Sequence, residues 1–180
     1  MLAGLFGATA AAREYAHNTV IATFLTTPDR PRALRAQLTA IAAGGGVLGL
    51  AGAALTTVAL AISLPLTDHG FMISTGGAAQ VLMASAWAGA AGAVLGAAIG
   101  EVVRNVGGAV TSAVVVLVIA PPVIVQLASG AAPWMPTTLA LVVSGVTDDT
   151  SVPAATVAIA LWALVPAMVA VWSVQRRDVV

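Results

Sequence analysis

The chain contains neither cysteine nor lysine, and it has few charged residues of any kind. Without cysteine there is no disulfide framework and no thiolate chemistry. Without lysine a phosphate-binding loop of the GxxxxGK[ST] type is impossible, so the chain cannot bind and split ATP by that route. Charged residues make up 8% of the 180 residues, against about a quarter in a typical soluble domain. These absences argue against a water-facing globular domain.

Catalytic and metal-binding patterns are also missing from the sequence. His17 and His69 are the two histidines, and no HExxH pattern or histidine–carboxylate cluster accompanies them. The GxSxG elbow of serine hydrolases is absent as well. No charged residue sits in the middle of an apolar run, as a proton or ion pathway would need. Gln126, the main polar candidate, is more simply interpreted as a local hydrogen bond between helices. We therefore expect no catalytic residue, no metal site and no cofactor in this chain, which is not an enzyme by this argument.

Long apolar runs dominate what is present, since 59% of the residues are hydrophobic. A membrane-crossing helix takes about 20 such residues. Four runs meet this length and predict an all-α, polytopic membrane protein of one domain, with spans over 36–64, 81–103, 108–127 and 152–174. Residues 1–12 are too few to cross, and we interpret them as a partial span or a short interfacial lead-in.

Prolines interrupt several of these apolar runs. Pro121 and Pro122 should kink or end the third span in its outer third, and Pro166 should bend the last one. Residues 131–146 are apolar but short and contain Pro133 and Pro136 near their start. We interpret that stretch as a re-entrant or interfacial segment on the outer side.

One span carries small residues at every fourth position. Such a ridge lets another helix approach closely, which favours association in lipid. It predicts close helix packing, within the chain or with a second subunit, at Ala84, Ala88, Gly92, Gly96 and Gly100.

The seven arginines all fall in gaps that the four spans place on one side of a membrane, whereas Asp68, Asp148 and Asp149 fall on the other. Positive charge marks the cytosolic side. We therefore expect a multi-pass protein of the inner membrane with its basic N-terminal helix and its C-terminus in the cytosol. The alanine-rich, arginine-only usage suggests a bacterium of high GC content. Glu101 and Arg104, three residues apart, can pair on a helix at the cytosolic end.

The segment 13–35 holds four of the arginines. Residues 13–27 have the periodicity of an amphipathic helix, which Pro28 ends, and residues 29–32 then form a short basic elbow. Two interpretations stay open from composition alone. The helix lies at the membrane surface against anionic headgroups, or it docks a cytosolic partner.

The string EYAHNTVIATFLTTPDRPRALRAQL resembles the stretch after the second span in ATP-binding-cassette exporter permeases of the drug- and polysaccharide-exporting type. The matching positions are Glu14, Tyr15, Thr19, Leu25, Thr27, Pro28, Arg30 and Arg32. The EVVRNVGGAV turn, the PWMP segment and the closing QRRDVV agree with that family in their order. Members of the family normally have six spans, so this chain looks like one that lacks the first span and most of the second.

The resemblance implies a membrane permease subunit that moves a hydrophobic or amphiphilic substrate (of the drug, lipid or glycan class) outward. A separate ATPase subunit would hold ATP and Mg and would dock on the matched residues of 14–32. A second permease subunit, identical or different, and membrane lipids would be the other partners, and nucleic acid would not. An alternative is a non-transporting membrane anchor or assembly protein with a basic lipid- or partner-binding helix. A passive channel fits less well, because polar lining residues are scarce.

Overall fold

The computed structural model describes residues 1–16, 30–63 and 75–176, which are almost entirely helical and contain no strand. The elements, in chain order, are α1 (Leu2–Ala16), α3 (Arg30–Ser63), α4 (Thr75–Val103), α5 (Val106–Val114), the π-helix η2 (Val115–Ile119), α6 (Ala120–Leu127), the 3₁₀-helix η3 (Ser129–Trp134), α7 (Pro136–Val143) and α8 (Val152–Arg176). Within the described residues, four helical stretches are long and apolar enough to cross a membrane: Arg32–Ser63, Gly76–Val103, Val106–Leu127 and Val152–Ser173. The fold is therefore that of an all-α membrane protein, as the sequence predicts.

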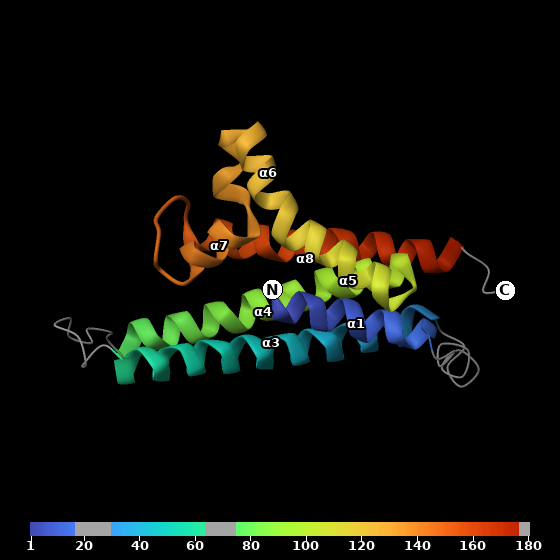
Figure 1. Cartoon of the computed structure of the whole chain (residues 1–180), viewed down its shortest axis with the longest axis horizontal. Helices are drawn as coiled ribbons and strands as arrows, with labels where there is room; N and C mark the ends of the chain where they lie inside the picture. The colour runs from blue at the N-terminus through green and yellow to red at the C-terminus, as the bar shows by residue number, and fades with distance from the viewer. Residues whose placement is uncertain (17–29, 64–74, 177–180) are drawn as a thin grey trace.

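The helix α4 lies at the centre of the bundle. It packs against α1 and α3 on one side and against α8 on the other, while α1 also contacts α3 and α5 (Figure 1). The helix α7 lies against α8, and α6 extends away from the bundle at an angle to it (Figure 1). The first helix is thus an internal element of the fold, although it is short.

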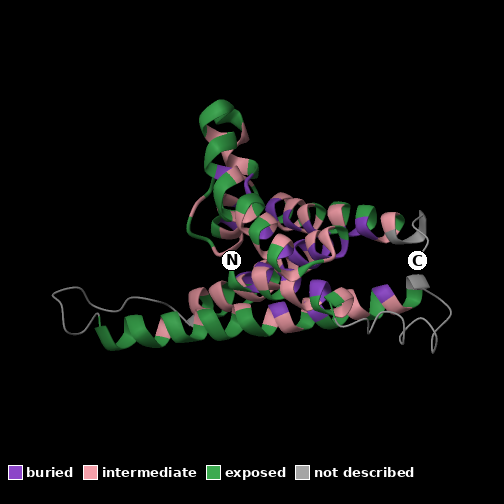
Figure 2. Ribbon diagram, turned by 45° about the vertical axis from the view of Figure 1, so that its right-hand side comes forward, coloured by how far each residue is buried: buried purple, intermediate pink, exposed green. Residues whose placement is uncertain are grey.

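The interior consists mainly of small side chains. Fully buried positions include Ala8, Ala11, Ala97 and Ala113, whereas large apolar side chains such as Leu55 point outward. Figure 2 shows the same distribution, with α3 exposed along most of its length beyond the contact with α4. Small residues inside and large apolar residues outside are what lipid-embedded helices need, because close backbone approach drives their association.

Glycines bring α1 and α4 into backbone contact. A Cβ added to Gly96 would overlap the carbonyl oxygen of Gly4, and one added to Gly7 would overlap that of Ala93. Further along, Gly100 faces Ala8, so the two helices run parallel. Because of this direction, the end of α1 arrives beside the end of α4.

Several boundaries differ from those predicted. Residues Arg13–Ala16 continue α1 rather than starting a new helix, and α4 begins at Thr75, six residues before the predicted span. The helix α3 begins at Arg30, so Arg30 and Arg32 lie in its first turn and not in an elbow. A proline is well tolerated in a first helical turn because its missing N–H would have no partner there, which explains why Pro31 does not delay the start.

The third span is interrupted where prolines predict a break. It consists of α5, η2 and α6, and the interruption is a π-helix that ends at Ile119, two residues before Pro121. The apolar stretch 131–146 contains the end of η3 and the short helix α7, neither long enough to cross a membrane. Pro166 lies inside α8, which runs on to Arg176.

Candidate functional site

Polar side chains gather where α1 and α4 end and α3 begins. We call this group the Tyr15 cluster: Glu14, Tyr15, Gln37, Glu101 and Arg104. It lies at the end of the bundle that also holds Arg13, Arg32, Arg35 and, at the end of α8, Arg176 (Figure 1). We call that end the arginine end. The cluster is therefore placed by the parallel packing of α1 on α4 and the antiparallel packing of α3 on α4.

A hydrogen bond between Tyr15 and Glu101 is the centre of the cluster. The Tyr15 hydroxyl donates to Oε2 of Glu101, which lies 86 residues away in the sequence. Glu101 is only 2% exposed, and a buried carboxyl group needs such a partner because burial without one is costly. This bond ties the last turn of α1 to the last turn of α4.

Arg104 closes the cluster from the turn that follows α4. Its guanidinium carbon lies 5.1 Å from the centroid of the Tyr15 ring, within range of a cation–π interaction. Arg104 has a φ of 57°, the left-handed conformation that usually belongs to glycine at a helix end. Adopting it costs a residue with a Cβ about 1–2 kcal/mol. The turn therefore carries strain at the residue that stacks on Tyr15.

Asn105 then starts the next helix. Its Oδ1 accepts a hydrogen bond from the backbone N–H of Gly108 at 2.7 Å, and its Nδ2 donates to the carbonyl oxygen of Val103 at 3.2 Å. The first is an ordinary N-terminal cap for α5. Together they keep the turn between α4 and α5 tight, so that Arg104 is held over α1.

Two buried donors in the cluster have no hydrogen-bond partner. These are Nε of Arg104 and Nε2 of Gln37, although the Gln37 side chain lies beside the Glu101 carboxylate. An unmatched buried donor costs about 1–3 kcal/mol. Rearranging the cluster would therefore break no hydrogen bond at these two atoms. The hydrogen bond that it would break is the one between Tyr15 and Glu101.

Burial shifts the proton affinities of the two cluster residues on α1. It raises the pKa of the Tyr15 phenol above its ordinary value of 10.0, and the Glu101 carboxylate raises that pKa further through its charge and hydrogen bond. The Arg104 guanidinium acts in the opposite direction. Burial also raises the pKa of the Glu14 carboxyl above its ordinary value of 4.5.

The Tyr15 shift can be measured directly, because the chain has a single tyrosine. The folded protein holds the phenolic proton more tightly than the unfolded chain, so this stabilising contribution is complete below pH 10 and is lost as the pH rises further. We expect the ultraviolet absorbance of the phenolate to appear at a pH above 10.0. In Glu101→Gln, which removes the charge, the midpoint should fall toward the ordinary value. An identical midpoint in both proteins would contradict the contact with Glu101.

The docking residues predicted from the sequence are only partly described. Glu14 and Tyr15 belong to the cluster, and Arg30 and Arg32 lie in the first turn of α3 at the same end of the bundle. The other predicted positions lie outside the described residues: Thr19, Leu25, Thr27 and Pro28.

Of the predicted packing ridge, Gly92, Gly96 and Gly100 face α1. Ala84 is buried nearer the start of α4, and Ala88 lines an open cavity near the start of α1. The second half of the ridge therefore packs against another helix of the same chain. The predicted helical pairing of Glu101 with Arg104 takes a different form. Arg104 lies beyond the end of α4 and stacks on Tyr15, while its charge still acts on the Glu101 carboxylate.

Sequence reasoning did not find the link between Tyr15 and Glu101, nor the part played by Gln37. The available signal was that the ridge of small residues leads directly to Glu101, so that whichever helix packs on the ridge must end near that carboxyl group. Among the described residues, no group of three or more histidine or acidic side chains is placed to hold a metal ion.

Comparison of the chain with protein families, with curated proteins and with solved structures finds no match. The site is therefore interpreted from its chemistry. It contains no nucleophile–base pair, and its groups instead connect three helices at one end of a membrane bundle. Such an arrangement can transmit a displacement of one helix end to the others.

Proposed function

We propose that this chain is the membrane permease subunit of an ATP-driven exporter of the ATP-binding-cassette type. The observation that carries the proposal is the Tyr15–Glu101 hydrogen bond. It joins the start of the stretch resembling an ATPase-docking segment to the last turn of α4, where the EVVRNVGGAV stretch begins, and both stretches contribute to the family resemblance. A structural connection between them is what a transport mechanism of this kind requires.

In the proposed mechanism, a separate ATPase subunit binds ATP and Mg and docks on the segment that begins at Glu14. Closure of the ATPase displaces the end of α1. The Tyr15 cluster passes this displacement to α4 and to the turn before α5, and the spans move as rigid elements. ATP favours the outward-facing arrangement only through its differential effect on the two states. No residue of this chain takes part in hydrolysis.

The position of the arginines supports an orientation with the cluster in the cytosol of a bacterium. All arginines in the described residues lie at the arginine end, and positive charge is retained on the cytosolic side of inner membranes. The apolar and nearly uncharged spans suit a hydrophobic or amphiphilic substrate. A second permease subunit, identical or different, would complete the pathway.

The test is whether an ATPase co-purifies with the chain. An affinity-tagged chain purified from native membranes in mild detergent should carry vanadate-sensitive ATPase activity, and Glu14→Ala combined with Thr19→Ala should reduce the co-purified activity several-fold. Thr56→Ala serves as the control, because among the described residues the Thr56 hydroxyl bonds only to the carbonyl oxygen of Gly52 within its own helix.

A different result would favour the anchor or assembly role. If the wild-type chain carries no ATPase activity, yet binds vesicles in proportion to their anionic lipid content, the exporter proposal is wrong. The arginine end would then serve to hold headgroups, at about 1 kcal/mol for each arginine near the surface.

A further inference from the structure

The regular hydrogen bonds of the third span are interrupted between α5 and α6. Proline has no backbone N–H, so Pro121 and Pro122 leave the carbonyl oxygens of Leu117 and Val118 without their usual helical donors. In the preceding π-helix, the N–H of Ala120 reaches back to the carbonyl oxygen of Val115, five residues earlier. Wide turns and prolines are the usual causes of bends in long helices.

Few tertiary contacts hold the segment beyond this point. The main contacts of α6 are with its chain neighbours η2 and η3, and it leaves the bundle at an angle (Figure 1). Val123, Ile124 and Leu127 of α6 are exposed, Leu127 by 84%. By contrast, Leu139 and Val142 of α7 are buried against Ala155 and Ile159 of α8. The segment formed by α6 and η3 is therefore anchored at its two ends and loosely packed between them.

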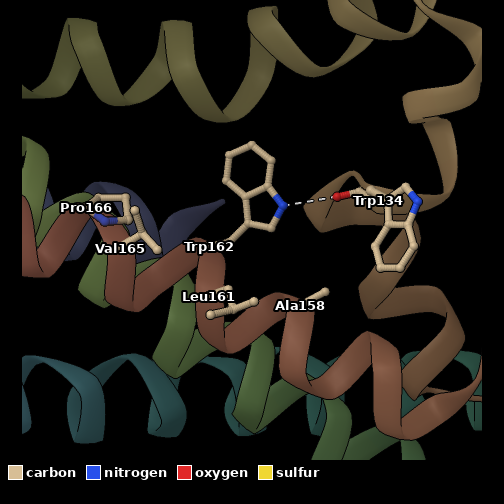
Figure 3. A pocket seen from close by; sticks show the side chains of 6 residues that line it. All are labelled: Trp134, Ala158, Leu161, Trp162, Val165 and Pro166. Atoms are coloured by element: carbon tan, nitrogen blue, oxygen red, sulfur yellow. Dashed lines mark hydrogen bonds between the residues drawn. The ribbon is translucent and has the colours of Figure 1, made fainter.

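An apolar cavity lies beside η3 on α8. Its volume is about 430 Å³, and it is lined by Trp134, Ala158, Leu161, Trp162, Val165 and Pro166 (Figure 3). The α8 residues are spaced three and four apart, so they form one face of that helix. The volume lies within the range of ligand-binding cavities. Since every lining side chain is apolar or aromatic, the chemistry that fits is hydrocarbon.

One hydrogen bond connects η3 to α8 beside the cavity. Nε1 of Trp162 donates to the carbonyl oxygen of Trp134 at 3.0 Å, and Figure 3 shows the two indole rings on either side of this bond. Trp134 itself is half exposed, so little else buries it. Breaking this bond would release η3 from α8 without disturbing the contact between α7 and α8.

We infer that α6 and η3 form a hinged lid along one side of this open cavity, with the hinge at η2, Pro121 and Pro122, and that the Trp162–Trp134 hydrogen bond holds the lid against α8. When the lid swings away from α8, the cavity widens and hydrocarbon chains of the surrounding bilayer fill it. The inference does not depend on the proposed exporter function.

Spin-label distances can test the lid, since the chain has no native cysteine. Labels at Leu127→Cys on α6 and Val157→Cys on α8 occupy exposed positions, 84% and 59% exposed, outside the cavity lining. In lipid nanodiscs, wild type should show mainly one distance. Trp162→Phe keeps a smaller aromatic ring but removes the donor, and should raise the ratio of open to closed lids about 2- to 10-fold, the range of one net hydrogen bond.

Two further variants complete the experiment. Trp87→Phe on α4 removes the indole N–H of a tryptophan that does not line the cavity, and should leave the distances as in wild type. Replacing Pro121 and Pro122 together by alanine restores two donors, and should shift and narrow the distance distribution because α6 then continues α5. If Trp162→Phe gives the same distance distribution as wild type, the lid proposal is wrong.

Discussion

Replacing Gly96 by valine should lower the free energy of unfolding by about 3 kcal/mol, the upper end of the usual range for overpacking. The reason is the nature of the neighbour. A Cβ at this position overlaps the backbone carbonyl oxygen of Gly4, and backbone, unlike a flexible side chain, cannot rotate away. The helices α1 and α4 would have to separate. Unfolding by dodecyl sulfate in mixed micelles, followed by circular dichroism, measures the loss.

The matched control is the same substitution at Gly52 of α3. A Cβ there meets no atom within 4 Å, so Gly52→Val should change the stability by much less than Gly96→Val. The intrinsic preference of the helix for glycine or valine is the same in both cases and cancels. Equal losses at the two positions would show that α1 does not lie against α4 as described.

Replacing Tyr15 by phenylalanine should cost about 2 kcal/mol, the middle of the range for a hydrogen bond to a charged group. The ring stays, so its contact with Arg104 is kept, and only the donor to Glu101 is lost. Glu101→Gln should also destabilise. In the double variant the two losses should not add, because both act on one bond. The unfolding experiment used for Gly96 measures all three variants.

Thr9→Val is the control for loss of a hydroxyl group from α1. Within the part of the chain that the structure describes, the Thr9 hydroxyl bonds only to carbonyl oxygens of its own helix, those of Leu5 and Phe6. Removing it should change stability by less than about 0.5 kcal/mol, as for substitutions away from shared networks. Strict additivity of Tyr15→Phe and Glu101→Gln would mean that the two side chains are not in contact in the membrane.

Apolar run length was sufficient to predict the four spans, since the cost of unsatisfied backbone groups in lipid permits only helices there. It was less informative about helix ends. Helices continue beyond the hydrocarbon into polar residues, which is why α4 already begins at Thr75 and α3 at Arg30. Hydropathy falls at those residues, whereas the helical hydrogen bonds do not end there.

The Tyr15 cluster could be anticipated only in part. The ridge on α4 indicated a close helix contact, but the sequence does not say which helix makes it. Once α1 is known to be that helix, its direction and the position of Gly100 bring Tyr15 to Glu101. The left-handed turn at Arg104 has no sequence signal, because glycine or asparagine would normally be expected at that position.

The contact between α1 and α4 has a mechanical consequence of its own. Shifting α1 lengthwise by one turn, about 5.4 Å, would bring Ala3 or Ala11 to the place of Gly7, where a Cβ overlaps the carbonyl oxygen of Ala93. The glycine contact and the bond from Tyr15 to Glu101 therefore specify the same register. A force along the axis of α1 would then carry α4 with it, so that the two helices move lengthwise as one rod.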